Sequence, residues 1–221
     1  MSAKVKIAED GRALFTVGMP GIGSKIQENA LRLFWDELRE RYGVEPSESG
    51  EAGQILVTLA PAGFRDEDQN FALNTETESE GGKWTLRLDA VGDRGVLYGF
   101  CEILDHVELV GGDLVLPALS GEFIPDVKRR GTERHWGPTF RTDAGVAANF
   151  DLIKMMARQR ANVALWNDNW IQPAWYPYLS MRYFPDLERP DEQGLLAANK
   201  ARLNRIIEEC NAWGIDFFLS C

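Results

Sequence analysis

The sequence predicts two domains, an α+β sandwich over residues 1–123 and an incomplete (β/α)8 TIM barrel, its first three strands, over residues 124–221. Strand and helix patterns are mixed in the first half, whereas the second half alternates strand, helix, strand, helix and strand. Polar residues gather directly after the strands of the second half, where a barrel enzyme carries its site. The stretch from Ile124 to Asp168 holds the first of these strand–helix–strand units.

The first sixty residues predict a short hairpin and a long helix. Apolar residues alternate with polar ones at 5–7 and recur at 15–17, which favours a hairpin. Residues 25–42 have helical spacing, with Ser24 suited to cap the start and Gly43 suited to end the helix. After a polar linker, further strands are predicted at 54–59, 71–75 and 84–89.

A second helix is predicted at 91–105, with Asp93 as its N-cap. Gly95 and Gly99 lie four residues apart in it, and each costs about 1 kcal/mol relative to alanine. Close packing against the sheet is the favoured explanation, and a functional role is the alternative. A hairpin-like segment at 114–117 and a boundary at 121–125 complete the first domain, which we expect to fold by itself.

The second half begins with a strand and a long loop from Ile124 onward. A helix is predicted at 149–161, a strand from 162, a helix at 195–213 and a strand at 215–221. This series specifies a parallel sheet, whose two faces need cover. Because no segment follows the third strand to cover its edge, we expect the chain to be the front part of a longer protein.

An aromatic-rich segment at 170–184 follows the second of these strands. It fits either a wall on which sugars stack or a buried hydrophobic loop, and both interpretations stay open.

The charge and hydropathy exclude several classes of function. A net charge of -10 argues against nucleic acid as a partner, because phosphate binding needs clustered Lys and Arg. No segment is long and apolar enough to predict a membrane span or a signal peptide, so the expected compartment is the cytoplasm.

The cysteines and histidines predict no metal site and no cofactor. Cys101, Cys210 and Cys221 have no metal-ligand spacing, and they fit buried small apolar residues better than a redox role. Two histidines are too few for a histidine-rich metal site.

Several motifs together resemble glycoside hydrolase family 20, the β-N-acetylhexosaminidases. They are Gly95-Val-Leu-Tyr-Gly99, Ile124-Pro-Asp126, Arg130-Gly131, and Leu152-Ile-Lys-Met-Met-Ala157 followed by Asn162-Val163. The resemblance implies a small non-catalytic α+β domain followed by the first part of a (β/α)8 barrel.

The resemblance also implies a sugar-binding role for Arg130, whose planar guanidinium offers paired donors to hydroxyls. A structural ion pair beside Arg129 is the alternative. Leu165-Trp166-Asn167 stands before Asp168 where the family has a His-x-His pattern, so other barrel glycosidases stay open. The predicted substrate-binding residues are Arg130, Trp136, Asn167 and Asp168.

No catalytic residue is predicted in this chain. The family cleaves with an Asp-Glu pair after the fourth barrel strand, assisted by the acetamido group of the substrate. The sequence ends at the third predicted strand. The adjacent acids Glu208-Glu209 and Glu67-Asp68 fit a polar helix face and a turn instead.

The sequence is compatible with three functions. The first is the amino-terminal portion of a glycoside hydrolase acting on terminal amino sugars, itself inactive, with the remainder of the barrel as its partner. The second is a non-catalytic carbohydrate-binding or interaction module. The third is a structural subunit whose sheet a partner chain completes.

Overall fold

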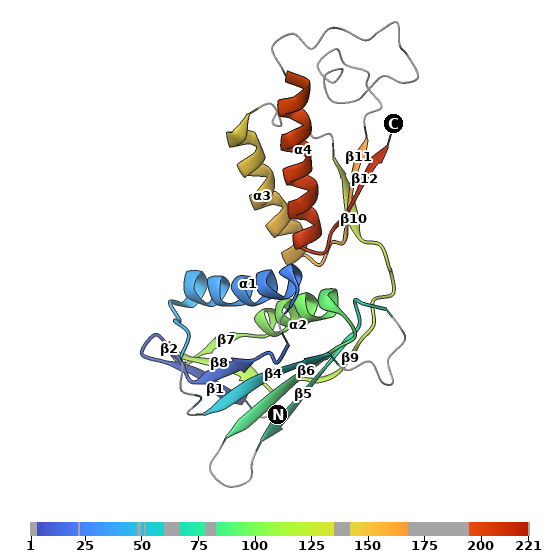
Figure 1. Cartoon of the computed structure of the whole chain (residues 1–221). Helices are drawn as coiled ribbons and strands as arrows, with labels where there is room; N and C mark the ends of the chain where they lie inside the picture. The colour runs from blue at the N-terminus through green and yellow to red at the C-terminus, as the bar shows by residue number, and fades with distance from the viewer. Residues whose placement is uncertain are drawn as a thin grey trace, which may run out of the picture. The chain divides into compact units, whose positions relative to one another are not determined.

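The structure is a computed structural model that describes residues 4–21, 23–47, 50, 52–59, 67–77, 83–134, 142–167 and 195–220. Only the backbone is described at 132–134, 166–167, 195–196, 199–200 and 219–220. Within these residues the chain has an α+β fold with mixed sheets and four helices (Figure 1). It divides into two compact units, residues 1–128 and 129–221, beside a predicted domain boundary at 123/124.

Unit 1, residues 1–128, contains two sheets. One is antiparallel with the order β2-β1-β8-β7, formed by Arg12–Ala13, Lys4–Glu9, Asp113–Pro117 and Glu108–Val110. The other is mixed with the order β3-β4-β6-β5-β9, formed by Phe15–Gly18, Gly53–Leu59, Trp84–Ala90, Phe71–Thr77 and Ser120–Phe123. Strands β3, β4 and β6 are parallel, and β5 is antiparallel to both of its neighbours.

Helix α1, Lys25–Tyr42, has the bounds and caps that the sequence predicts. The Ser24 hydroxyl accepts a hydrogen bond from the Gln27 N–H at 3.2 Å, and Gly43 ends the helix with φ 67°. The apolar stripe of this helix, which includes Leu33, Phe34 and Leu38, is buried. Local capping and periodicity therefore determine this element.

Close packing explains the two glycines of helix α2, Asp93–Asp105. A Cβ at Gly99 would collide with the Leu88 side chain of β6, and one at Gly95 would lie 2.5 Å from the Asn70 carbonyl. The predicted N-cap was wrong by one residue, because Gly92 occupies that position in extended backbone. The Asp93 carboxylate instead accepts a hydrogen bond from Gln27 Nε2 of α1 at 2.7 Å.

Two strands differ from the sequence prediction. The opening hairpin joins β1 to β2 around Asp10-Gly11, whereas β3 leaves it and pairs in parallel with β4 in the other sheet. The predicted boundary at 121–125 overlaps β9, which pairs with β5 and stacks Phe123 on Phe71 at 4.6 Å between ring centroids. Both differences are strand pairings between distant segments, which local periodicity does not encode.

Unit 2, residues 129–221, alternates strands and helices. Its elements are β10 Gly131–Arg134, α3 Asp143–Arg158, β11 Val163–Asn167, α4 Leu195–Ala212 and β12 Asp216–Ser220. The strands are parallel and adjacent in sequence order, and both helices lie on the same side of them (Figure 1). The identification of this unit with the start of a (β/α)8 barrel stays a prediction.

Two bounds in unit 2 correct the prediction. The strand expected from Ile124 begins only at Gly131. Helix α3 begins at Asp143 instead of 149, because Thr142 caps it by accepting a hydrogen bond from the Gly145 N–H at 3.1 Å. Val146 in the added turn is fully buried, so packing also supports the earlier start.

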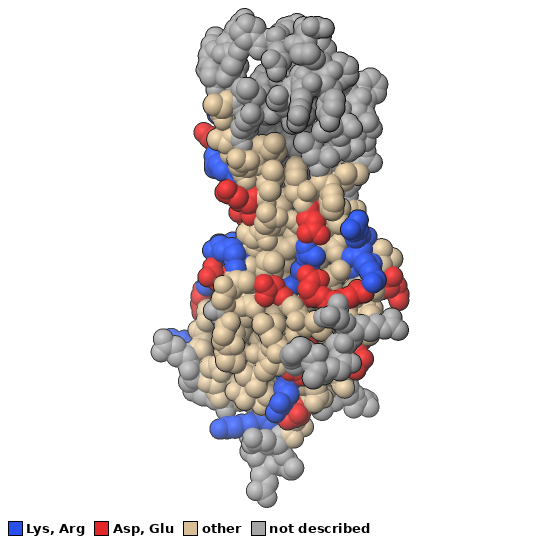
Figure 2. Space-filling model, turned by 45° about the vertical axis from the view of Figure 1, so that its right-hand side comes forward, with Lys and Arg blue, Asp and Glu red and all other residues tan. Residues whose placement is uncertain are grey.

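The hydropathy of the helices and the distribution of surface charge are both ordinary for a globular protein. No helix within the described ranges is long and apolar enough to cross a membrane. On the face shown in Figure 2, acidic and basic side chains are interspersed instead of separated into patches of one sign.

The segment 124–128 contacts the rest of unit 1 through Lys128. These contacts allow a test of whether the first domain ends at residue 123 or at residue 128. Gln69, 6% exposed, donates from Nε2 to the Lys128 carbonyl at 2.8 Å, and Lys128 forms an ion pair with Glu67. Removing 124–128 leaves the Gln69 amide without this acceptor. We expect a 1–123 protein to unfold with a free energy about 1–3 kcal/mol lower than that of a 1–128 protein, measured by urea denaturation.

The matched control is Lys128→Ala in the 1–128 protein, which keeps the backbone acceptor and removes the ion pair between the exposed Lys128 ammonium and Glu67. Its expected loss is below about 1 kcal/mol. Equal denaturation midpoints for the two lengths would show that the segment contributes nothing to unit 1.

Candidate functional site

The candidate site is the carboxyl edge of the parallel sheet in unit 2. In parallel α/β sheets, ligands bind beyond the carboxyl ends of the strands. The strand register places Asn167, the last residue of β11, opposite Ser220, the last residue of β12. Arg134, the last residue of β10, pairs with Trp166 one position earlier. These backbone positions define the edge.

Of the predicted site residues, one lies at this edge, one lies at the opposite end of the sheet, and two lie outside the described residues. Asn167 lies on it by its backbone position. The side chain of Asn167, and Trp136 and Asp168 altogether, lie outside the described residues. Their substrate-binding role stays a prediction. Ser220 was not among the predicted site residues, although its place as the last polar residue of a predicted strand was a usable signal.

Arg130 lies at the opposite, amino-terminal end of the sheet, directly before β10. Its backbone N–H donates to Asn162 Oδ1 at 2.7 Å, and its carbonyl accepts from the backbone N–H groups of Asn162 and Val163 at 2.7 and 3.0 Å. Its side-chain Nε donates to the Arg160 carbonyl at 3.0 Å. These bonds tie the start of β10 to the turn between α3 and β11.

The local sequence explains that turn. Helix α3 ends at Arg158, and Arg160 then adopts the left-handed conformation with φ 60°. The Ala161 N–H returns to the Met156 carbonyl at 3.0 Å, which closes the helix end. Asn162, only 2% exposed, then holds the Arg130 backbone. The geometry gives Arg130 a structural contact, and its sugar-binding role stays a prediction.

The sheet face turned away from α3 and α4 is partly exposed within unit 2. Leu165 of β11 and Phe218 of β12 are register partners, and Phe218 is 39% exposed. The Arg129 guanidinium lies 5.7 Å from the centroid of the Phe218 ring. On the other face of β11, Ala164 is fully buried.

Cys210, Glu209 and Asp68 have structural surroundings that account for them. Burial, and secondarily the charge of Glu209, raises the pKa of the Cys210 thiol to about 12, so it stays protonated at neutral pH. Glu209 accepts a hydrogen bond from Trp213 Nε1 at 2.7 Å, and Asp68 pairs with Arg94 at 3.3 Å. Within the described ranges, no group of three or more His, Cys, Asp or Glu could hold a metal ion.

No protein-family model matches the chain, and no curated protein matches it. Solved structures of glycoside hydrolases do. A GH138 enzyme targeting pectin rhamnogalacturonan II has a TM-score of 0.63 and 14% identity, over 93% of this chain and 24% of that one. The Flavobacterium johnsoniae chitobiase of family GH20 has a TM-score of 0.60 and 18% identity, over 99% of this chain and 33% of that one.

The β-N-acetylhexosaminidase of Bacteroides fragilis has a TM-score of 0.57 and 13% identity, over 99% of this chain and 42% of that one. At these identities the likeness shows a shared fold alone. The chain spans between about a quarter and two-fifths of the length of these structures.

The contacts of Arg130 yield a prediction for unit 2. Arg130→Met keeps the aliphatic stem but removes the donor to the Arg160 carbonyl, with an expected cost of about 1–3 kcal/mol in the free energy of unfolding. Arg129→Met is the matched neighbour and removes only the contact with the Phe218 ring, at a cost of about 0.5–1 kcal/mol. Chemical denaturation followed by circular dichroism measures both. A smaller loss for Arg130 than for Arg129 would contradict the structural contact.

Proposed function

We propose that this chain is the amino-terminal portion of a glycoside hydrolase that acts on terminal sugars, amino sugars in particular. Unit 1 is then the small non-catalytic domain, and unit 2 is the first three strands of a (β/α)8 catalytic barrel. The observation that carries the proposal is the shared fold with glycoside hydrolases over 93–99% of this chain.

The topology of unit 2 supports the barrel assignment. Its three strands follow one another in space in their sequence order, with one helix after each of the first two. A (β/α)8 barrel is built by this repeat, and a doubly wound sheet reverses its strand order instead. The partly exposed face with Leu165 and Phe218 then corresponds to the barrel interior, which the later strands enclose.

The position of the substrate follows from the strand direction. Sugar hydroxyls would meet Asn167 at the end of β11, Asp168 next to it in the sequence, and Trp136, which follows β10 by two residues, because barrel sites lie at the carboxyl ends of strands. Arg130 precedes β10 at the opposite end of the sheet, and its side chain donates to the Arg160 carbonyl, so its position supports a sugar contact less well. We therefore rank Asn167 and Asp168 above Arg130 as substrate-binding residues.

The sugar class is proposed more broadly than the resemblance alone implies. Leu165-Trp166-Asn167 replaces the His-x-His pattern of β-N-acetylhexosaminidases. One similar structure is described as targeting pectin and another as a chitobiase, so the shared fold accompanies different glycosides. The proposal is a glycosidase for a terminal amino sugar or a related glycoside.

On this proposal, the 221-residue chain by itself does not catalyse hydrolysis. Hydrolysis of a glycoside needs a positioned general acid, which contributes roughly 10²–10⁴-fold. The resemblance places that acid after a fourth barrel strand, and three strands are described in unit 2. The catalytic pair is therefore proposed to lie in the remainder of the barrel.

The test compares the 221-residue chain with the product of a longer reading frame that carries the remaining barrel units. We expect release of 4-nitrophenol from 4-nitrophenyl N-acetyl-β-glucosaminide, or from a related glycoside in a panel, only by the longer protein. An Asp168→Asn variant of the longer protein should raise KM by roughly tenfold or more, since it replaces a charged acceptor of sugar hydroxyls by a neutral amide with one acceptor oxygen.

Three results would contradict the proposal. They are turnover by the 221-residue chain alone, no turnover of any glycoside by the longer protein, and a stop codon directly after Cys221 in an independently sequenced locus.

A further inference from the structure

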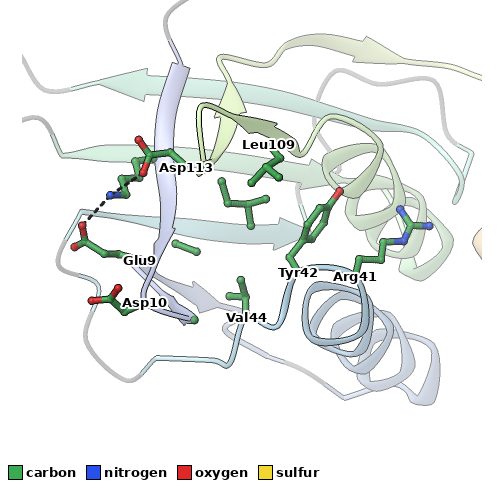
Figure 3. Close-up of a pocket in the computed structure, with 12 residues that line it drawn as sticks. Glu9, Asp10, Arg41, Tyr42, Val44, Leu109 and Asp113 are labelled. Carbon is green, nitrogen blue, oxygen red and sulfur yellow. Dashed lines mark hydrogen bonds and ion pairs between the residues drawn. The ribbon is translucent and has the colours of Figure 1, made fainter.

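A groove of about 550 Å³ lies in unit 1, far in sequence from the proposed catalytic edge (Figure 3). It is formed by the end of α1, by the strands β1, β7 and β8, and by the turns that join them. Aliphatic side chains including Val44, Leu109 and Leu114 line it together with Tyr42. Its volume falls within the range of small-molecule sites.

Two tight turns form part of the groove wall before any ligand arrives. The β1–β2 turn is Asp10-Gly11, with φ 48° and 74°, and the β7–β8 turn is Gly111-Gly112, with φ 63° and 97°. Two-residue hairpin turns with both φ values positive match the twist of the strands that they join. The position of Asp10 is therefore set by the hairpin.

The groove has an excess of negative charge at one side. Glu9, Asp10 and Asp113 lie together there, and Tyr42 lies at the other side with Val44 and Leu109 between (Figure 3). Lys6 Nζ is shared between Glu9 at 2.8 Å and Asp113 at 3.0 Å. Among the described residues no cation pairs with Asp10, so this side attracts a positively charged group.

The cation near Tyr42 does not offset that excess. The Arg41 guanidinium is 3.1 Å from Glu37 Oε2, a residue outside the groove lining, and its charge is matched there. Leu109 is 68% exposed, the largest fraction among the exposed large apolar residues described. The groove thus combines an aromatic ring, exposed aliphatic surface and unbalanced carboxylates.

We propose that this groove binds an oligosaccharide that carries free amino groups, such as an oligomer of glucosamine. A sugar ring packs on Tyr42 and the aliphatic floor, while an ammonium group lies beside Asp10 and its neighbouring acids. The choice of a saccharide over another amine rests on the proposed function. The site itself is separate from the catalytic edge and anchors a polymer without cleaving it.

Calorimetry on the 221-residue chain tests the proposal with two probes, a glucosamine tetramer and an N-acetylglucosamine tetramer. We expect the glucosamine tetramer to bind at least about fivefold more tightly, because only its amines are charged, and the difference to shrink in high salt. Asp10→Asn should remove the preference, and asparagine tolerates the positive φ of that turn. Tyr42→Ala should weaken both tetramers by about tenfold.

Two further variants separate binding from folding. Tyr42→Phe keeps the ring and should bind like the original chain, which identifies a loss in Tyr42→Ala as loss of the ring. Glu122→Gln changes an exposed acid on β9, outside the groove, and should leave both affinities unchanged. Absence of glucosamine binding, equal binding of both tetramers, or an Asp10→Asn variant with unchanged preference would overturn the proposal. Because no hydrolysis is measured, these results are independent of whether the longer protein is a glycosidase.

Discussion

Unit 2 depends on one constraint, the need of a parallel β-sheet for cover on both of its faces. Two crossovers that advance in the same direction place α3 and α4 on one face, as Figure 1 shows. Ala164, fully buried, lies on that face, whereas Phe218 on the other is 39% exposed. Among the described residues, helices therefore cover one face of this sheet and apolar side chains remain partly exposed on the other.

The mixed sheet of unit 1 buries one face and exposes the other, which its antiparallel strands permit. Trp84, Leu86 and Leu88 of β6 alternate with more exposed residues, and helix α2 approaches the sheet closely because Gly95 and Gly99 have no side chains. The exposed face of the sheet therefore differs between the units. Strand β6 of unit 1 carries Thr85, Arg87 and Asp89 on that face, whereas unit 2 carries Leu165 and Phe218.

The sequence predicted what short-range chemistry determines. Helix α1 followed from a serine cap, an apolar stripe and a terminal glycine, all within twenty residues. The departure of β3 into a second sheet and the pairing of β9 with β5 involve distant segments, and no local pattern specifies them. For the site, strand ends indicated Asn167, but the Arg-Gly motif could not show that Arg130 contacts the α3–β11 turn.

The central claim, that the exposed sheet face becomes a barrel interior, is tested by the cost of Phe218→Ser in two proteins. In the 221-residue chain the ring is partly exposed, so we expect a loss of about 1 kcal/mol or less in the free energy of unfolding. In a longer protein with the remaining barrel strands, the loss should reach about 3–5 kcal/mol, as for a buried aromatic ring. Equal losses in the two proteins would contradict the account.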